Sequence, residues 1–275
     1  MIAFPNIDPV AFSIGPLSLF GKTIGPLSVH WYGIMYILAF ASAFLIGLWR
    51  AKKPFTALNT SQVEDLVFYG ALGVVLGGRV GYMVFYNFQD LLANPFALFK
   101  VWEGGMSFHG GLIGVTLAML LFARKTKLNF FDVTDFVAPL IPVGLGFGRI
   151  GNFIGGELWG RETNVPWGMI FPDDQLGLVR HPSQLYQAFL EGFLLAVLIL
   201  WFANKPRPRA TVSAFFLIFY GIQRFFVEFF REPDAHIGLV FQDWLSRGQL
   251  LSIPMIVVGV AIFYGAYVKN YWDKR

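Results

Sequence analysis

The sequence predicts an all-α integral membrane protein with seven transmembrane helices and a small external arm and cap. Its composition is the first reason: of 275 residues, 56% are hydrophobic and only 14% are charged, whereas ordinary soluble domains contain about 25% charged residues. The mean hydropathy is +0.58. The second reason is that apolar stretches of membrane-spanning length alternate with polar segments along the chain. These observations exclude an ordinary soluble fold.

Seven stretches are long and apolar enough to be predicted as spans. A bilayer core requires about 20 mainly apolar residues in each helix, and polar breaks separate the stretches from one another. The predicted spans are residues 31–49, 66–86, 106–123, 133–150, 184–203, 211–230 and 249–268.

The basic residues indicate how these spans are oriented. Most of the 21 Lys and Arg residues stand in short segments on one side of the predicted membrane. These are Arg50, Lys52 and Lys53; Arg124, Lys125 and Lys127; Lys205, Arg207 and Arg209; and Lys269, Lys274 and Arg275. The opposite side carries Lys22, Lys100, Arg161, Arg180, Arg231 and Arg247, spread over longer segments. By the positive-inside rule, the N-terminus is predicted to lie outside and the C-terminus in the cytoplasm.

The chain divides into an arm, residues 1–29, and a membrane domain, residues 30–275. The first segment lacks a basic start followed by an apolar run and a cleavage site, so we expect an external arm rather than a signal peptide. The pattern I-G-P-L-S at 14–18 recurs at 24–28, and it predicts turns at the membrane interface. Residues 155–183 are rich in Gly, Pro and charge, and they are predicted to form an external cap.

Several ionisable residues fall within the predicted spans. Such a residue costs at least about 2.5 kcal/mol on insertion scales, so it normally faces protein or water and indicates function. The polar residues that fall in the external half are Tyr32, Arg79, His109, Arg149, Tyr186 and Arg224. Residues far apart in the sequence are therefore predicted to converge on one leaflet.

One face of the sixth span is polar. Tyr220, Arg224, Glu228 and Arg231 follow spacings of four, four and three, which place them on one helix face. One interpretation is a buried ion pair between Arg224 and Glu228 that fixes the register of the helix. The alternative is anion binding, because the intramembrane arginines outnumber the nearby acids, Glu157 and Glu228. Guanidinium groups suit phosphate, and the abundant anion of a membrane is a phospholipid headgroup.

His109 also has two interpretations. A histidine at a helix start is often an interface residue that makes a hydrogen bond. However, Gly110 and Gly111 permit close approach of backbone or substrate, and histidine accepts a proton near neutral pH, which makes His109 a candidate base. Glu191, midway along the fifth span, is either a second functional acid or a buried structural partner.

Other chemistries lack the residues that they need. The sequence contains no Cys, so it has no nucleophilic thiol or thiolate metal site of its own. It has neither an HExxH motif nor a Cys/His cluster, and we expect no metal and no other cofactor. The net charge of +4 is explained by loop topology, so we expect no nucleic-acid partner.

A series of motifs stands in a characteristic order along the chain. Residues 148–160 read G-R-I-G-N-F-I-G-G-E-L-W-G, and Arg161 follows. The others are H-W-Y-G at 30–33, G-G-R at 77–79, S-F-H-G-G at 107–111, R-H-P-S-Q-L-Y at 180–186 and R-F-F-V-E-F-F-R-E-P-D at 224–234. In this order they resemble the prolipoprotein diacylglyceryl transferase family along nearly the whole chain. One departure is Gly155, where the family commonly has Asn, so a hydrogen bond from that amide is not expected here.

The resemblance implies a multi-pass enzyme of the bacterial inner membrane, with seven spans, a periplasmic N-terminus and an active site toward the periplasmic leaflet. This family moves the diacylglyceryl group of phosphatidylglycerol onto the thiol of the lipobox cysteine of a prolipoprotein. The reaction forms a thioether and releases glycerol 1-phosphate. The nucleophile therefore belongs to the protein substrate, which explains why this chain needs no Cys.

Site residues follow from the resemblance and from the predicted depths. His109 is the candidate base, and Arg149 and Arg224 are the candidates for stabilising the departing phosphate. The residues expected to contact the substrates or shape their pocket are His30, Tyr32, Arg79, Arg149, Asn152, Glu157, Gly160, Tyr220, Glu228 and Arg231.

A transporter or flippase for an anionic phospholipid is the alternative, because an arginine-lined cavity in the membrane would serve either activity. A transport path is expected to continue polar into the cytoplasmic half, where the predicted spans offer only Asp135 and Glu191. An intramembrane protease is disfavoured, because the sequence has no aspartyl dyad and no serine in a nucleophile-like glycine frame to pair with His109.

Overall fold

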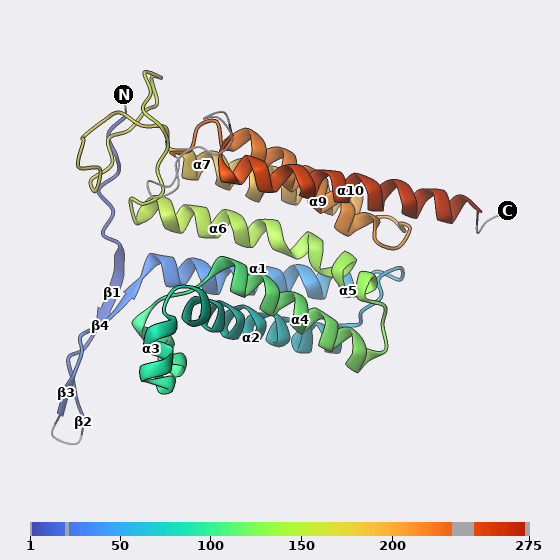
Figure 1. Cartoon of the computed structure of the whole chain (residues 1–275), viewed down its shortest axis with the longest axis horizontal. Coiled ribbons are helices and arrows are strands. Elements are labelled where there is room, and N and C mark those ends of the chain that lie inside the picture. Colours follow the sequence, from blue (N-terminus) through green and yellow to red (C-terminus); the bar gives the residue numbers. More distant parts are fainter. Residues whose placement is uncertain (1, 20–21, 233–244, 273–275) are drawn as a thin grey trace. The chain divides into compact units, whose positions relative to one another are not determined.

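The computed structural model describes residues 2–19, 22–232 and 245–272, and these are mostly helical (Figure 1). The α-helices are α1 (Trp31–Ala51), α2 (Thr60–Phe85), α3 (Phe88–Ala93), α4 (Phe108–Thr126), α5 (Phe130–Val137), α6 (Ile141–Ile154), α7 (Ser183–Gln187), α8 (Leu195–Phe202), α9 (Thr211–Val227) and α10 (Arg247–Trp272). The 3-10 turns are η1 (Pro95–Phe99), η2 (Val101–Glu103) and η3 (Ala138–Leu140), and η4 (Ala188–Leu194) is π-helical. The strands are β1 (Val10–Ile14), β2 (Leu17–Leu19), β3 (Lys22–Ile24) and β4 (Leu27–His30).

The chain folds as two compact units, and each is described by itself. One unit contains Met1–Ala43 together with Ala138–Arg275, and the other contains Phe44–Val137. The predicted basic residues Lys274 and Arg275, and the last two residues of the 224–234 motif, lie outside the described residues.

Every predicted span coincides with a helical stretch. Within the described ranges, five helical stretches are long and apolar enough to cross a membrane: Trp31–Ala51, Thr60–Phe85, Phe130–Ile154, Ser183–Phe202 and Arg247–Lys269. The helix of the sixth predicted span, Thr211–Val227, is apolar but shorter. The helix of the third, α4, has 19 residues and is not among those five. The prediction of a multi-pass membrane protein is therefore confirmed, while the count of seven spans stays a prediction.

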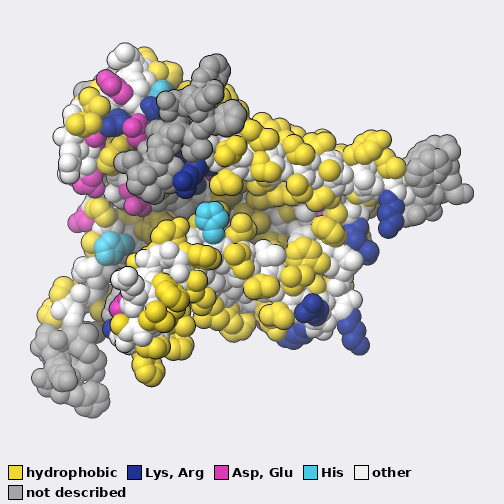
Figure 2. Space-filling model, in the orientation of Figure 1, with side chains coloured by type: hydrophobic (Ala, Val, Ile, Leu, Met, Phe, Trp, Pro, Cys, Tyr) yellow, Lys and Arg dark blue, Asp and Glu magenta, His cyan; other side chains and the backbone are white. Residues whose placement is uncertain are grey.

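The surface of these helices suits a lipid environment. Along α10, Leu251, Val257, Val260 and Tyr264 are all exposed. Figure 2 shows hydrophobic side chains along most of the visible side of this helix. A soluble protein rarely exposes so continuous an apolar surface, and lipid chains are the solvent that such a surface requires.

The N-terminal arm differs from its prediction. It was expected to consist of interfacial turns, but β1 pairs with β4 and β2 pairs with β3, all antiparallel. The two I-G-P-L-S copies lie opposite each other, with Ile14 facing Leu27 and Leu17 facing Ile24. The all-α expectation is therefore wrong for the arm, because each copy supplies the hydrogen-bonding partner of the other. Gly15 and Gly25 both have φ of +97°, a conformation that glycine adopts without steric cost.

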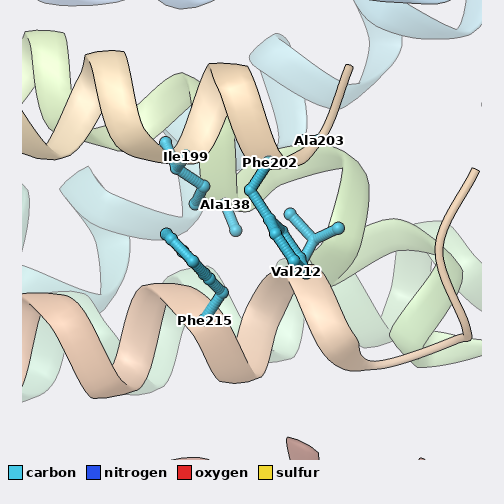
Figure 3. Packing of buried hydrophobic residues seen from close by; sticks show 6 residues of the cluster. All are labelled: Ala138, Ile199, Phe202, Ala203, Val212 and Phe215. Carbon is cyan, nitrogen blue, oxygen red and sulfur yellow. The ribbon is translucent and has the colours of Figure 1, made fainter. Parts of the chain in front are cut away.

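The membrane part of the first unit has its own apolar core. Ala138 of η3, Phe202 of α8 and Phe215 of α9 pack together, with the two Phe rings stacked at 4.4 Å (Figure 3). The other buried members of this cluster are Ile199, Ala203 and Val212. The cluster joins η3, the end of α8 and the start of α9.

A second core anchors the cap to α6. Phe153, at the end of α6, packs with Met169 and Phe171 of the cap. Phe4 from the N-terminal segment contacts both rings, at 5.3 and 5.1 Å, and Trp159 stacks on Phe171 at 5.8 Å. Residues 155–183 therefore fold as a compact structure of their own, and the start of the chain is held against it.

The second unit is organised by close contact between α2 and α4. A Cβ atom built on Gly77 would lie 2.4 Å from the Gly110 carbonyl oxygen, and one built on Gly114 would lie 2.1 Å from the Gly73 carbonyl oxygen. Neither position tolerates a side chain without separating the helices. Small residues at such a helix interface are typical of membrane proteins. For Gly110, it is thus the backbone of α2 that makes the predicted close approach.

Candidate functional site

Three of the sequence motifs meet in the first unit, at the junction of α6, the cap and α7. The Gly160 N–H donates to the His181 carbonyl at 2.8 Å, and the Arg161 N–H donates to the Phe230 carbonyl at 2.9 Å. In addition, Gln184 of α7 donates from its side chain to the Glu157 carbonyl at 2.7 Å. The 148–161, 180–186 and 224–231 segments therefore hold one another in place.

Gly160 lies where these segments approach closely. A Cβ atom there would lie 2.4 Å from the Phe230 carbonyl oxygen and 2.7 Å from both the Cβ atom and the carbonyl oxygen of His181. Gly160 also forms an antiparallel bridge with Arg231. The absence of a side chain is what allows the loop after α6 to lie against the segment after α9.

Asn152 and Glu157 form a polar pair at the end of α6. The Asn152 amide nitrogen donates to Glu157 Oε1 at 2.8 Å, and the Glu157 N–H donates to the Asn152 carbonyl at 3.1 Å. The Asn152 side chain is buried, whereas Glu157 is exposed. The two bonds set the shape of the turn that follows Arg149.

Two arginines from different helices share one buried carboxylate. Nη2 of Arg149, on α6, lies 3.9 Å from Oε2 of Glu191, and Nη1 of Arg224, on α9, lies 3.6 Å from Oε1 of the same residue. The Glu191 side chain is 0% exposed, while those of Arg149 and Arg224 are 23% and 15% exposed. The predicted convergence of Arg149 and Arg224 is therefore observed, and Glu191 is the group that links them.

A second carboxylate, Glu228, lies at the end of α9. It makes ion pairs with Arg224, one turn earlier, and with Arg231, at 3.4 Å. Ser246 donates its hydroxyl to Glu228 Oε2 at 2.6 Å. The Arg224–Glu228 pair predicted from spacing is thus present, and it belongs to a larger cluster of guanidinium and carboxylate groups.

The predicted tyrosines lie in the same unit. The Tyr32 hydroxyl is 3.4 Å from the Tyr36 hydroxyl on the next turn of α1. The Tyr32 ring is in contact range of Gly151, because a Cβ atom there would lie 3.0 Å from Tyr32 Cδ2. Tyr220 stands one turn before Arg224 and stacks on Phe216 at 5.4 Å.

His30, at the end of β4, is exposed, and its backbone pairs with Val10. Among residues 2–19, 22–232 and 245–272, no side-chain contact of His30 bears on its predicted role.

Arg79 belongs to the second unit, and its surroundings differ from the prediction. Its guanidinium group donates to the carbonyl oxygens of Ala97 and Leu98, at 2.5 and 3.2 Å, and also to that of Gly104. The side chain is buried. Counting Arg79 among arginines that await an anion was therefore wrong, because backbone carbonyls from residues 97–104 already surround it.

His109 also belongs to the second unit. It is the second residue of α4, whose N-terminus is capped by the Ser107 hydroxyl accepting from the Gly110 N–H at 3.2 Å. The imidazole is exposed and meets the Phe108 ring edge-on at 5.7 Å. The imidazole is therefore accessible to a substrate. Its role as a base stays a prediction.

The comparison with known families agrees with the motifs. The family model described as prolipoprotein diacylglyceryl transferase matches residues 20–265. The chain belongs to this family. The resemblance inferred from the sequence is thereby confirmed, and with it the assignment to the transferases.

Relatives match over nearly their whole length. A phosphatidylglycerol–prolipoprotein diacylglyceryl transferase from Teredinibacter turnerae is 60% identical over 267 residues, covering 97% of this chain and 93% of the relative. A protein of the same name from Acinetobacter baylyi is 56% identical over 276 residues, covering 99% and 97%. Another from Marinomonas sp. is 54% identical over 274 residues, covering 100% and 98%.

The departure from the family pattern at Gly155 has little structural consequence. Its φ is −70°, which any residue adopts. A Cβ atom there would meet the Gly151 carbonyl oxygen at 3.4 Å and Glu157 Cγ at 3.7 Å, which are ordinary contacts. The position therefore has room for a side chain.

The cap is held by a buried ion pair. Nε of Arg180 donates to Asp174 Oδ2 at 2.6 Å, and Nη1 of Arg180 donates to Glu232 at 3.2 Å. The Arg180 guanidinium, with the N–H groups of Leu176 and Leu178, holds the pKa of the Asp174 carboxyl below its usual range. This network joins the cap to the segment that follows α9.

Three residues that organise the site were missed or left open. Glu191 had two interpretations, and only its contacts with both arginines give it a place in the site. Ser246 was missed, although Ser246 and Gln249 have the spacing of a capping box, which was a usable signal. Gln184 was missed as well; a polar residue at the start of an apolar span was the signal there.

Proposed function

We propose that this chain transfers the sn-1,2-diacylglyceryl group of phosphatidylglycerol to the thiol of the lipobox cysteine of prolipoproteins, the first step of bacterial lipoprotein maturation. The observation that carries the proposal is the Arg149–Glu191–Arg224 arrangement. It places two partly exposed guanidinium groups in a membrane chain that has no thiol of its own. The names of the relatives support the same two substrates.

The proposed setting is the bacterial inner membrane. The chain has seven spans, a periplasmic N-terminus and a cytoplasmic C-terminus, as the alternation of basic segments indicates. The active site lies toward the periplasmic leaflet, with residues 1–29 as a periplasmic arm and 155–183 as a periplasmic cap on the membrane domain. This side suits the reaction, because a secreted prolipoprotein presents its cysteine there.

The proposed headgroup site is built around α6 and α9. Arg149 and Asn152 contact the phosphate region of the lipid, and Arg224 and Glu228 form the opposite wall. Guanidinium groups suit this role because they stay protonated and donate paired hydrogen bonds to phosphate oxygens. The further proposed contacts, from residue type and family resemblance, are His30, Tyr32, Glu157, Gly160, Tyr220 and Arg231.

The proposed reaction is a displacement at a glycerol carbon. The sulfur–hydrogen bond and the bond between carbon and phosphate oxygen break, and a carbon–sulfur bond forms. The electron pair of the broken carbon–oxygen bond goes to the phosphate, which leaves as glycerol 1-phosphate. Because this group gains negative charge, Arg149 and Arg224 stabilise the transition state more than the bound substrate.

The proposed proton acceptor is His109. A free cysteine has a pKa of about 8.5, so most of the substrate thiol is protonated at neutral pH. A base that removes this proton raises the concentration of the reactive thiolate. Tyr32 or Tyr220 is proposed to orient the thiol or the base.

The experiment combines purified protein, phosphatidylglycerol vesicles and a lipobox peptide. The expected products are glycerol phosphate and a peptide whose mass rises by one diacylglyceryl group. Arg149→Ala is expected to lower the rate by at least about a hundredfold, the scale for losing a charge-stabilising group. Arg124→Ala, at an exposed position near the end of α4, is the control and should keep the rate.

Three results would contradict these assignments. Full activity of Arg149→Ala would exclude its headgroup role. Movement of labelled phosphatidylglycerol between leaflets without any thioether product would favour the transporter. For His109→Gln, the rise of the rate with pH should flatten, and an unchanged pH profile would reject His109 as the base.

A further inference from the structure

Glu191 is the most deeply buried charged group of the candidate site. Its side chain is 0% exposed, and neither carboxylate oxygen has a hydrogen-bond donor among the described residues. Its partners are the guanidinium groups of Arg149 and Arg224, at 3.9 and 3.6 Å. Both distances are longer than a hydrogen bond, so Glu191 acts on these arginines through its charge.

A π-helical turn brings the Glu191 carboxylate between α6 and α9. Residues 188–194 form a π-helical turn, with α7 before it and α8 after it. Such turns are rare and occur often at functional sites. Next to Glu191, a Cβ atom on Gly192 would lie 2.6 Å from the Gly146 Cα atom. The glycine pair thus lets α6 and η4 approach closely, which brings Arg149 near Glu191.

Glu228 differs from Glu191 in how it is held. It accepts the Ser246 hydroxyl at 2.6 Å and pairs with Arg224 and Arg231. These bonds account for Glu228 as part of the connection between α9 and α10. They leave open why a second carboxylate, without hydrogen bonds, is buried beside the same arginine, since burying a charge costs several kcal/mol.

The charges of the substrate and product suggest the reason. A phosphodiester carries one negative charge, whereas a phosphate monoester carries between about 1.5 and 2 at pH 7. An arginine pair with no counter-charge would therefore hold the monoester more tightly than the diester. An enzyme that consumes a diester and releases a monoester needs the opposite bias, because a tightly held product blocks the next turnover.

We propose that Glu191 is a specificity-determining counter-charge, which lowers the affinity of the Arg149–Arg224 pair for a dianionic phosphate monoester relative to a monoanionic phosphodiester. This inference rests on the proposed function for the identity of the two ligands. The guanidinium groups are partly exposed and reach the ligand, while Glu191 is fully enclosed and opposes its charge from behind. Within the described part of the chain, the other ionisable groups that interact with Glu191 are Tyr220 and Glu228.

The test is equilibrium binding of two probes to the purified full-length protein in detergent micelles. The probes are glycerol 1-phosphate and a short-chain phosphatidylglycerol, and the quantity compared is the ratio of their dissociation constants. In Glu191→Gln, which keeps the shape and removes the charge, the affinity for the monoester should rise about tenfold relative to the diester. Tenfold is about 1.4 kcal/mol, close to the interaction of unit charges about 10 Å apart at a dielectric constant of about 20.

Two further variants separate charge from structure. Glu191→Asp keeps the charge and should keep the ratio within about threefold of the wild type. Asp65→Asn makes the same carboxylate-to-amide change at an exposed residue of α2 and should leave the ratio unchanged. Because a ratio does not depend on the fraction of folded protein, partial misfolding of a variant does not imitate the effect.

A pH measurement gives the decisive comparison. At about pH 5, below the second pKa of a phosphate monoester near 6, both probes carry about one negative charge. The tenfold gain of Glu191→Gln should therefore disappear at that pH, which a purely structural effect would not do. An unchanged ratio in Glu191→Gln at neutral pH, or a gain of the same size at both pH values, would overturn the proposal.

The kinetic consequence distinguishes this proposal from the proposed function. In the transfer assay, Glu191→Gln should show stronger inhibition by added glycerol 1-phosphate and a lower kcat, because product release becomes slower. If Glu191→Gln shifts the ratio of dissociation constants as predicted but the wild-type protein makes no thioether, the proposed function fails while the counter-charge stands. If transfer proceeds and the ratio of dissociation constants is the same in the wild type and in Glu191→Gln, only the counter-charge proposal fails.

Discussion

The Ser246 hydroxyl connects the start of α10 to the arginine cluster, and its removal is expected to destabilise the fold. It accepts the Gln249 N–H at 3.1 Å and donates to Glu228 Oε2 at 2.6 Å. Losing a serine N-cap costs about 1 kcal/mol, and losing a hydrogen bond to a charged group costs about 1.5–3 kcal/mol. For Ser246→Ala we therefore expect the free energy of unfolding to fall by about 3 kcal/mol.

Ser252 is the matched control on the same helix. It is a buried serine too, but its hydroxyl donates to the Gly248 carbonyl one turn earlier, at 2.7 Å. A bond of this kind adds little to helix stability, so Ser252→Ala should cost less than about 1 kcal/mol. The difference between the two variants isolates the cap and the bond to Glu228.

The assay is denaturant unfolding of purified protein in detergent micelles, followed by tryptophan fluorescence, with the transfer rate measured in parallel. Ser246→Ala should also lower the transfer rate, because Glu228 loses a group that fixes its position between Arg224 and Arg231. Ser246→Thr keeps the hydroxyl and should recover most of both losses. Equal destabilisation by Ser246→Ala and Ser252→Ala would refute this reasoning.

Three further predictions concern helix packing, the family departure and acid stability. Gly114→Ala places a Cβ atom 2.1 Å from a carbonyl oxygen of α2, so unfolding measurements should show a loss of about 1–3 kcal/mol; Gly111→Ala, whose nearest neighbour is at 3.7 Å, should cost less. Gly155→Asn meets only ordinary contacts, and its transfer rate should stay within about twofold of the wild type; a large loss would show that this loop tolerates no side chain. Because Arg180 lowers the folded-state pKa of Asp174, the pair stabilises the cap above the unfolded pKa of about 4, and this stability is lost as the pH falls through the folded-state pKa. Unfolding between about pH 7 and 3 should show this loss in the wild type and not in Asp174→Asn; parallel curves would contradict the assignment.

The arm shows where local sequence patterns mislead. The I-G-P-L-S repeats contain Gly and Pro, which indicate turns when they are considered one at a time. Their pairing, with Ile14 opposite Leu27 and Leu17 opposite Ile24, depends on two segments satisfying each other's backbone hydrogen bonds. That property belongs to the pair of segments, so neither repeat alone predicts it.

Arg79 and Arg149 likewise show that the sequence does not reveal the surroundings of a charged residue. Both were recognised as charges in apolar spans, since their cost in lipid requires a polar environment. The sequence does not tell which environment that is. The carbonyl oxygens of residues 97–104 surround Arg79, whereas Arg149 faces the Glu191 carboxylate and keeps 23% of its side chain exposed. Every residue has a backbone carbonyl, so the sequence does not reveal which carbonyls accept from an arginine. Only the folded chain distinguishes a structural arginine from one that is a candidate for binding an anion.

The sequence by itself determined the membrane character, the places of the helical stretches and the family, because each depends on local composition or on the order of motifs along the chain. It also indicated that Arg149 and Arg224 would converge. Only the tertiary structure decided that Glu191 stands between them and that Ser246 holds Glu228. Those contacts join α6, η4, α9 and the start of α10. A charge is stabilised or opposed by whatever lies within a few ångströms of it, and in a folded chain that neighbour comes from anywhere in the sequence.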